Sequence, residues 1–585
     1  MTFLGLNLNN ISDVLPPPKF ERDIMGRPDE HEWRESMTKE YKGKVGNKTF
    51  ILVPRKPWMK VLKTKLVFTN KLKPDLTLDE RKTRWVGCGY AQLPGVHFDK
   101  TYQATAKSTS VRLFFILLAY YDLDDALIDA IKAYTQADLD IDLYCEQMPG
   151  FIEIDKATGE PYVCKLLKAL EGLKQAGHLW QKATTDFLKG YGFTQHWCEP
   201  CIFYLKGERG IIIALVWVDD FAIGYNSKAM FDEFYSAYSK RFNAKLVGKI
   251  EKFVGILITR DRARREVTLN QSDLIEKIMG KFFPTPNMLK TTHAPAWFTD
   301  KSERVNTYSE LKLATNDADN IVKKGKPYLS LVASLLYVST MTRPDVAYHV
   351  AQLCRYMAAP TEECYMRAEE LLSYLYHTRY MGLKYMGKEF KLPDVYGFTG
   401  KVEINRTKFE SNLGLHAYCD ASWRVGNTYA GHVIMLLNAA LDWSSKMLKV
   451  QASSSEAEIS SGCLATRRLL FVRNVMTPLM ELFDDTLKGA TPLLIDNSAA
   501  IELSENVGVS KKTEHFKRWQ HTLRDETNNG VIKPTFIRTK WQVADILTKI
   551  VTRNLFWQMR DIMINRESTS AKALVANAIK WLRSA

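Results

Sequence analysis

The sequence predicts a multidomain protein that combines α+β and α/β architecture. Three observations lead to this prediction. The chain has 585 residues, enough for three or four domains of ordinary size. Short apolar runs rich in β-branched residues, typical of strands, alternate with longer segments of helical character. From Leu415 onward the order becomes strand, strand, strand, helix, strand, helix, strand, which indicates a separate C-terminal domain.

The N-terminal half begins with a flexible arm over residues 1–28, where three prolines stand in a segment of little periodicity. A helix is expected over residues 31–41, and a near-continuous apolar run over residues 110–120 predicts a buried helix. Residues 166–191 read as helical, with Gly172 near a break, and a further helix is expected from Gln271. Strands are predicted at residues 49–53, 66–70, 82–86, 127–131, 211–216, 221–224, 254–258 and 267–270.

The C-terminal half starts with a connector rich in Pro, Asn, Thr and Lys over residues 281–325. Helices are predicted at residues 330–341, 343–357, 362–380, 455–482 and from 543. Strands are predicted at residues 415–419, 431–437, 441–444, 493–495 and 535–537. Apolar residues at helical spacing over residues 571–582 predict a packed or partner-binding helix at the end of the chain.

The charge balance favours a polyanionic partner. The chain has 81 Lys and Arg residues and 66 Asp and Glu residues, which gives a net charge of +15. Such an excess suits salt-dependent binding of phosphate groups. The nine cysteines are odd in number and irregularly spaced, which favours a reducing intracellular compartment. Cys198 and Cys201 have the spacing of half a zinc site, but no second pair matches them. No run has the character of a signal peptide or a membrane span.

The most informative stretch is Trp217-Val218-Asp219-Asp220, which lies between two apolar runs. Two adjacent carboxylates between strands predict a hairpin turn that points out of a sheet. Like charges side by side are unfavourable unless a cation neutralises them, and Mg²⁺ takes carboxylates together with substrate phosphates. Two such ions can clamp the attacking and leaving oxygens of a phosphoryl transfer. An Asp-Asp pair taken alone would more often be an ordinary charged hairpin turn. The sequence on either side is therefore needed to distinguish a metal site from such a turn.

Six further blocks stand in order around this turn. With it, the chain resembles the reverse transcriptase and ribonuclease H part of a copia-type (pseudoviral) LTR retrotransposon polyprotein, from about Glu30 to about Thr552. The blocks are residues 32–37 (EWRESM), similar to the first helix of the family; 82–90 (KTRWVGCGY), similar to KARLVARGF; 129–134 (DAIKAY), similar to DVKTAF; 146–151 (EQMPGF), similar to EQPEGF; 170–176 (LEGLKQA), similar to LYGLKQA; and 342–348 (TRPDVAY), similar to TRPDIAY.

The resemblance implies a right-hand polymerase with fingers, palm and thumb, followed by a helical connection and a ribonuclease H-like domain. The expected boundaries are an arm at 1–28, fingers and palm at 29–270, thumb and connection at 271–400, a ribonuclease H-like domain at 410–560, and a C-terminal helix at 566–585. The implied activity is RNA-directed DNA synthesis by two-Mg²⁺ phosphoryl transfer, with degradation of RNA in RNA–DNA hybrids, in retrotransposon replication.

In the polymerase part, the resemblance makes Asp129, Asp219 and Asp220 the catalytic and metal-binding carboxylates. Three acidic groups from neighbouring strand ends can hold two Mg²⁺. The resemblance assigns Tyr134 to the sugar of the incoming nucleotide, where it would exclude a ribose 2′-hydroxyl; the alternative is a core aromatic. Contacts to the incoming nucleotide are expected from Lys82 and Arg84, because guanidinium suits bidentate phosphate binding. Gln175 is expected to line the same site, with a helix cap or a surface amide as the alternative.

In the C-terminal part, the resemblance implies a second carboxylate set for two further Mg²⁺ ions, with Mn²⁺ as an alternative in both sites. Its members are Asp420, Glu458, Asp496 and Asp545. Glu458 is preferred to Glu456 because an alanine precedes it and an apolar residue follows it, as in the family. Residues two apart also face different sides of a helix. The stretch Thr513-Glu514-His515 and His521 resemble a family segment whose histidine assists product release, with a helix-surface histidine as the alternative.

The expected partners are an RNA template, a DNA primer, RNA–DNA hybrid and dNTPs, with integrase or other proteins of the element as additional partners and no membrane. The expected location is intracellular, in cytoplasmic virus-like particles, in the nucleus or in both. Two alternatives stay open. One is a degenerate or host-adopted element that binds nucleic acid without catalysis. The other is ribonuclease H activity alone, which Trp217 would support because the family usually has Tyr there.

Overall fold

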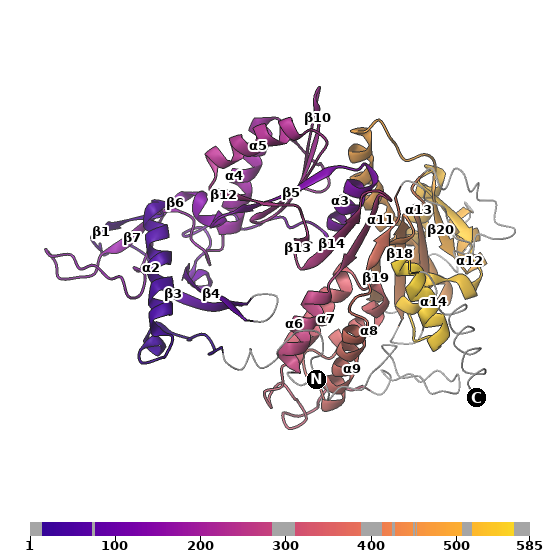
Figure 1. Ribbon diagram of the computed structural model, residues 1–585. Coiled ribbons are helices and arrows are strands. Elements are labelled where there is room, and N and C mark those ends of the chain that lie inside the picture. Colours follow the sequence, from indigo (N-terminus) through magenta and orange to yellow (C-terminus); the bar gives the residue numbers. More distant parts are fainter. Residues whose placement is uncertain are drawn as a thin grey trace, which may run out of the picture. The chain divides into compact units, whose positions relative to one another are not determined.

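The computed structural model describes residues 14–72, 77–283, 311–387, 412–423, 428–448, 451, 453–505 and 517–566 (Figure 1). The chain forms two compact units. The first comprises residues 1–106 and 125–249, and the second comprises residues 107–124 and 250–585. Part of the expected arm (1–13), most of the expected connector (284–310) and the expected tail helix (571–582) lie outside the described residues.

The first unit is built on a six-stranded sheet in the order β12-β5-β11-β10-β9-β8. Strand β5 alternates buried residues with less buried ones, and β10 and β11 are buried along most of their length. The helices of this region are α4 (Ala176–Tyr191) and α5 (Lys228–Arg241). The strands are β5 (Asp124–Ala130), β8 (Thr194–Gln195), β9 (Ile202–Gly207), β10 (Gly210–Trp217), β11 (Asp220–Tyr225) and β12 (Ala244–Gly248).

A second sheet of this unit has the order β1-β7-β6-β2, and a long hairpin joins β3 to β4. Helix α2 (Glu30–Gly46) packs against β4 and buries Trp33 and Met37. One hydrophobic core runs through the whole unit and includes Trp85 and Trp180. The strands are β1 (Phe50–Val53), β2 (Val61–Leu62), β3 (Thr64–Leu72), β4 (Leu78–Gly87), β6 (Asp138–Cys145) and β7 (Val163–Lys168).

The second unit begins with α3 (Ser108–Tyr120), whose near-continuous apolar sequence is buried as expected. A four-stranded sheet has the order β13-β14-β15-β16, and helices α6 to α9 pack on one another beside it. The strands are β13 (Lys252–Phe253), β14 (Ile256–Asp261), β15 (Glu266–Asn270) and β16 (Leu383–Tyr385). The helices are α6 (Ser272–Phe282), α7 (Tyr328–Met341), α8 (Ala347–Cys354) and α9 (Glu362–His377).

The C-terminal sheet of the second unit has the order β19-β18-β17-β20-β21. The first three strands pair antiparallel, whereas β17–β20 and β20–β21 pair parallel. The long helix α11 (Ser454–Glu481) covers β17 and β18. The other elements are β17 (His416–Ser422), β18 (Tyr429–Leu436), β19 (Ala439–Met447), β20 (Thr491–Ile495), α12 (Ser498–Glu505), α13 (Lys517–Asn528), β21 (Ile532–Phe536) and α14 (Arg553–Ile564).

The predicted fold class is confirmed: a mixed multidomain chain of the kind expected for a polymerase followed by a ribonuclease H-like domain. The boundaries assigned to fingers, palm, thumb and connection stay predictions.

Two predicted helices differ in the structure. Residues 166–168 belong to strand β7, and α4 begins only at Ala176, because Gly172 adopts a φ of +87° in the turn between them. The helix predicted from residue 543 is the short 3₁₀ helix η9 (Val543–Leu547).

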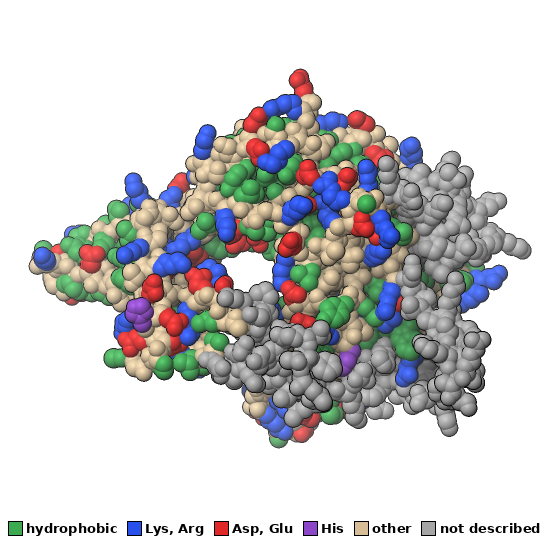
Figure 2. All heavy atoms as spheres, in the orientation of Figure 1, with side chains coloured by type: hydrophobic (Ala, Val, Ile, Leu, Met, Phe, Trp, Pro, Cys, Tyr) green, Lys and Arg blue, Asp and Glu red, His purple; other side chains and the backbone are tan. Residues whose placement is uncertain are grey.

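Charge, hydropathy and the state of the cysteines add three facts. Basic and acidic side chains are interspersed over the visible face of the molecule, so the net charge of +15 does not by itself mark a path for a polyanion (Figure 2). Among the described residues, no helix is both long enough and apolar enough to span a membrane. All nine cysteines are free thiols.

Two candidate active sites

The first candidate site lies at the tip of the β10–β11 hairpin, in the first unit. Antiparallel pairing of Trp217 with Asp220 leaves Val218 and Asp219 as a two-residue turn. Val218 has a φ of +57°. Two-residue hairpin turns need a positive φ at their first central position, which is costly for a β-branched residue. Asp219 is thereby placed at the exposed tip, and Asp220, the first residue of β11, is half-buried.

Strand β5 brings Asp129 to the same place. This strand lies next to β11 in the sheet. The backbone N–H of Ala130 donates to the carbonyl oxygen of Asp219 at 2.8 Å. Asp129, which directly precedes Ala130, is half-buried. A backbone hydrogen bond therefore joins the strand that bears one predicted carboxylate to the hairpin that bears the other two.

The carboxylates of the turn lie in an environment that favours cation binding. Burial raises the pKa of Asp220 to about 6, and the charges of Asp219 and Asp129 add to the effect. Asp219 stands at an exposed tip, yet partial desolvation by its surroundings raises its pKa, and Asp129 adds to that. Like charges this close disfavour one another's ionised form unless a cation is present. Oxygen ligands of this kind suit Mg²⁺.

Lys82 and Arg84 lie on one face of β4, because Thr83 and Trp85 alternate with them and are buried. Both cations lower the pKa of Asp219, so they are within electrostatic reach of the turn. Burial lowers the pKa of Lys82, and the charge of Arg84 adds to that. A bound anion close to Lys82 and Arg84 would relieve this repulsion.

Tyr134 lies half-buried in a short 3₁₀ helix (Ala133–Gln136) that follows β5. Burial raises the pKa of its hydroxyl, and the charges of Asp219 and Glu171 contribute. The hydroxyl is therefore within electrostatic reach of Asp219, and the side chain packs against the hydrophobic core of the unit.

Gln175 is different from the other predicted nucleotide contacts. Its side chain is 2 % exposed. Its Oε1 accepts from Gln92 Nε2 at 2.9 Å, and its Nε2 donates to the His97 carbonyl oxygen at 2.8 Å. Both ends of the amide thus have internal partners. The structure places Gln175 in the packing at the start of α4, without an atom free for a nucleotide.

The second candidate site lies on the C-terminal sheet. Asp420 is on β17, and Asp496 directly follows β20, the parallel neighbour of β17. Glu458 lies in the second turn of α11, which packs on β17, and accepts the backbone N–H of Ala421. One oxygen from each of Asp420, Glu458 and Asp496 lies within 4.8 Å of the others. Within the described part of the chain, no other acidic, His or Cys group is gathered this tightly.

Asp545, the fourth predicted carboxylate, lies beside this trio on η9. Lys549 connects them: its Nζ is 2.9 Å from Asp545 Oδ1 and 3.5 Å from Asp420 Oδ2. The hydroxyl of Thr548 also donates to Asp420. Neither Thr548 nor Lys549 was predicted from the sequence to have a role. Lys549 stands four residues after Asp545, and in the helix that the sequence predicted from residue 543 this spacing would have paired the two charges, a signal that could have identified Lys549.

The donor set of the second site fits a divalent cation. Burial raises the pKa of Glu458 to about 9 and that of Asp545 to about 7, and the charge of Asp420 adds to both shifts. Burial raises the pKa of Asp496 as well. Glu458 Oε2 is buried and has no hydrogen-bond partner among the described residues. Burying such an atom without a partner is unfavourable, so a bound cation would stabilise the site.

The structure describes only part of the segment in which a histidine was predicted to assist product release. Thr513, Glu514 and His515 lie outside the described residues. His521 is half-buried on α13, where Arg524 contacts its Nδ1.

The fold and the two carboxylate groups define a polymerase-like protein with a nuclease-like C-terminal domain. The family described as reverse transcriptase (RNA-dependent DNA polymerase) matches residues 47–295. A transposon Ty5-1 protein of Saccharomyces cerevisiae is 30% identical over 337 residues, which are 57% of this chain and 96% of that protein. The chain belongs to the copia-type reverse transcriptase family of retrotransposons.

Longer relatives match most of the chain. The retrovirus-related Pol polyproteins from transposon TNT 1-94 of Nicotiana tabacum and transposon RE1 of Arabidopsis thaliana are 28% and 29% identical over 94% and 90% of this chain. The chain spans 39% and 33% of their lengths. A solved foamy viral protease–reverse transcriptase in complex with double-stranded DNA aligns with a TM-score of 0.43 at 11% identity, over 86% of this chain and 70% of that chain.

Proposed function

We propose that this chain is an RNA-directed DNA polymerase that extends a DNA primer on an RNA template with dNTPs, and that its C-terminal domain cleaves RNA in the resulting hybrid. The observation that supports this most strongly is the pair of carboxylate groups at strand ends in a chain of the reverse transcriptase family. Intact acidic groups in both places favour catalysis over nucleic-acid binding alone. The proposed setting is intracellular replication of a retrotransposon, together with other proteins of the element such as integrase.

In the polymerase site, Asp129, Asp219 and Asp220 would hold two Mg²⁺. Bound there, the ions would activate the primer hydroxyl and neutralise the charge that develops on the leaving pyrophosphate. Lys82 and Arg84 would bind the triphosphate, since their cations lie within electrostatic reach of the turn. Tyr134 would contact the sugar and exclude a 2′-hydroxyl.

In the nuclease site, Asp420, Glu458, Asp496 and Asp545 would hold a second pair of ions. Those ions would activate a water molecule and stabilise the phosphate that it attacks. Thr548 fixes one oxygen of Asp420 through its hydroxyl, and Ala421 fixes Glu458 through its backbone N–H. The two carboxylates are thus oriented before any ion binds.

One paired assay tests the proposal. A labelled RNA–DNA substrate is followed for primer extension and RNA cleavage in the same reaction. Asp219→Asn removes a charge from the polymerase site and is expected to lower extension about a thousandfold, or about 4 kcal/mol, while cleavage continues. Asp496→Asn is expected to do the reverse. The matched control, Asp140→Asn, alters an exposed aspartate on β6 and should change neither rate.

Unchanged extension in Asp219→Asn would contradict the polymerase assignment, and unchanged cleavage in Asp496→Asn would contradict the nuclease assignment. Cleavage without extension in the wild type would favour ribonuclease H activity alone. Both single variants should still bind hybrid, with an affinity that falls as salt rises, because basic residues elsewhere make those contacts.

A further inference from the structure

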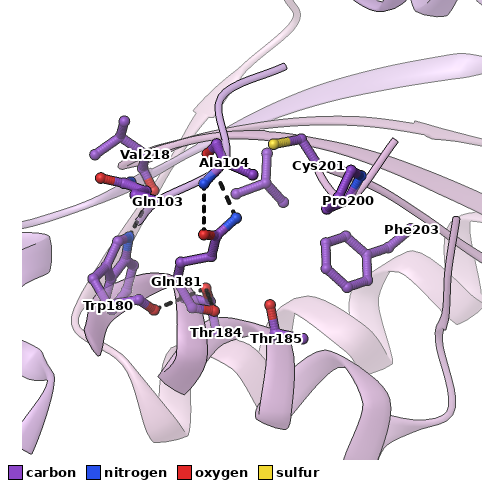
Figure 3. A pocket seen from close by; sticks show the side chains of 11 residues that line it. Gln103, Ala104, Trp180, Gln181, Thr184, Thr185, Pro200, Cys201, Phe203 and Val218 are labelled. Atoms are coloured by element: carbon purple, nitrogen blue, oxygen red, sulfur yellow. Dashed lines mark hydrogen bonds between the residues drawn. The ribbon is translucent and has the colours of Figure 1, made fainter. Parts of the chain in front are cut away.

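Helix α4 contacts the carboxylate turn through Trp180, a residue with no predicted role. The indole Nε1 of Trp180 donates to the carbonyl oxygen of Val218 at 2.6 Å (Figure 3). The indole is 1 % exposed, and its ring packs edge-on against Phe242 at 5.2 Å. The donor is therefore held by the core and aimed at the peptide group that directly precedes Asp219.

The turn needs such support. Val218 adopts a φ of +57°, a conformation that a β-branched residue rarely occupies unless its surroundings enforce it. Two consecutive carbonyl groups of the turn are held from outside the hairpin: that of Val218 by Trp180, and that of Asp219 by the N–H of Ala130. The second bond sets the separation of the turn from the strand of Asp129. The first fixes the peptide plane between Val218 and Asp219.

The position of Trp180 is itself fixed. The next residue on α4, Gln181, accepts from the N–H of Ala104 at 2.8 Å through its Oε1, which holds the preceding loop against the helix (Figure 3). A small hollow remains between helix and turn, lined in part by Val218, Thr184, Cys201 and Phe203.

We propose that Trp180 is a positioning residue of the polymerase site, which holds Val218 in its strained conformation and thereby aims the Asp219 carboxylate. This inference rests on the proposed polymerase function. Trp180 acts through the backbone of the turn and touches no reacting atom. Its loss should therefore lower kcat for nucleotide addition and leave the KM for dNTP nearly unchanged, because the misplaced group acts in the transition state.

The strain at Val218 supplies a readout that a packing role would not give. Trp180→Phe keeps an aromatic ring and removes the donor. Val218→Gly removes the cost of a positive φ, because glycine adopts it freely. In the double variant Trp180→Phe/Val218→Gly, the turn should hold its conformation without the indole. Glycine should therefore restore activity that phenylalanine removed.

The test compares wild type, both single variants and the double variant in the full-length protein. Trp197→Phe is the matched control, since Trp197 is 69 % exposed. Trp180→Phe is expected to lower kcat about tenfold to a hundredfold, with RNA cleavage unchanged, and the double variant should recover most of that loss. A kcat equal to that of Trp197→Phe, or a double variant as slow as Trp180→Phe, would overturn the inference.

A second measurement does not depend on polymerase activity. Hydrogen–deuterium exchange in the absence of substrate reports the N–H of Ala130, whose partner is the carbonyl oxygen of Asp219. Exchange there should be faster in Trp180→Phe, unchanged in Trp197→Phe and restored in the double variant. Unchanged exchange in Trp180→Phe overturns the inference. Absence of primer extension in the wild type would overturn the proposed function alone, and the exchange result would still decide the role of Trp180.

Discussion

Tyr134 offers the most specific test among single residues of the polymerase site. It follows Asp129 by five residues, and the charge of Asp219 acts on its hydroxyl. Tyr134→Ala should raise the ratio of rNTP to dNTP incorporation on an RNA template by about tenfold or more, as expected when a contact of about 1.4 kcal/mol that distinguishes the sugars is lost. Tyr134→Phe retains the ring and should keep the wild-type ratio. Equal ratios in wild type and the alanine variant would mean that Tyr134 is a core aromatic.

His349 provides a pH-dependent prediction. It is buried on α8, and burial lowers its pKa to about 3. The unfolded chain, with a histidine pKa of about 6.5, binds a proton more readily, so the stability from neutral His349 is present above pH 6.5 and is lost as the pH falls toward 3. Because of His349, the free energy of unfolding should fall by about 2 kcal/mol when the pH is lowered from 7 to 5.

Urea unfolding of the second unit at pH 7 and pH 5 measures this loss of stability. His349→Gln cannot be protonated in this range, so its stability should change about 2 kcal/mol less between the two pH values than that of the wild type. His377→Gln alters an exposed histidine on α9 and serves as the control. Parallel losses in wild type and His349→Gln would contradict the prediction.

What the sequence reveals about single residues depends on how far apart the contacts are along the chain. The seven predicted carboxylates lie on strands, just after strands or on helices, and local pattern with the family resemblance made them candidates. The structure groups Glu458 with Asp420 and Asp496, which agrees with the choice of Glu458 over Glu456. The contact of Trp180 with Val218 joins positions 38 residues apart, and no periodicity in the sequence predicts it. Gln175 stands in a matching motif, yet only the fold shows that Gln92 and His97 occupy its amide.

At the scale of elements, the TRPDVAY block (342–348) acquires a structural explanation. Arg343 and Asp345 are both fully buried, and their side chains pair at 2.8 Å where the short 3₁₀ helix η5 (Pro344–Val346) leads into α8. Tyr374 on α9 donates to Asp345 at 2.7 Å, and Arg343 donates to the carbonyl oxygen of Thr378 at 3.1 Å. The block therefore ties α8 to α9 through a buried ion pair.

Breaking this pair should destabilise the helical part of the second unit. Asp345→Asn leaves the buried charge of Arg343 without its counter-ion, which should cost about 3–5 kcal/mol of unfolding free energy. The double variant Arg343→Met/Asp345→Leu removes both charges and should lose less than Asp345→Asn does. Denaturant titration of the three proteins, with the exposed Asp317→Asn as control, measures the difference. A double variant less stable than Asp345→Asn would contradict this explanation.

The elements that the sequence analysis placed well have strong periodicity or clear turn signals. The buried helix expected at 110–120 is α3, and the strands on either side of the Asp-Asp pair are β10 and β11. Residues 166–168 were wrongly assigned to a helix. A short apolar run such as this one has no decisive period, and pairing of β7 with the preceding strand β6 and with β1, which is far away in sequence, makes it a strand.

At the scale of the whole molecule, helix α3 belongs to the second unit although the sequence on both sides of it belongs to the first. Arg112 shows why. Its guanidinium is buried, donates to the carbonyl oxygens of Leu441 at 2.7 Å and Met341 at 2.9 Å, and lies 4.0 Å from the centre of the Trp443 ring. Contacts with partners 229 and 329 residues away cannot be read from local sequence, so no pattern around residue 112 predicted this arrangement.

The chain passes from α3 directly into β5, the strand that ends with Asp129 and Ala130. Loss of the Arg112 contacts should therefore affect both activities, unlike the separable losses expected for Asp219→Asn and Asp496→Asn. Arg112→Met leaves several buried carbonyl groups without their donor and should cost about 3 kcal/mol or more of unfolding free energy in the second unit. Extension and cleavage should then fall together as temperature rises toward the lowered unfolding midpoint.

Thermal unfolding of the full-length protein, followed alongside the paired assay at several temperatures, provides the measurement. Arg264→Met is the matched control, since the Arg264 side chain is 71 % exposed, and it should unfold at the wild-type temperature. If Arg112→Met kept wild-type stability, the buried guanidinium would not be what holds α3 in the second unit. If extension alone declined while cleavage and the unfolding midpoint stayed unchanged, α3 would influence only the strand of Asp129. A joint decline is expected because one helix supplies both the buried partner of β19 and the start of the chain that leads to the polymerase carboxylates.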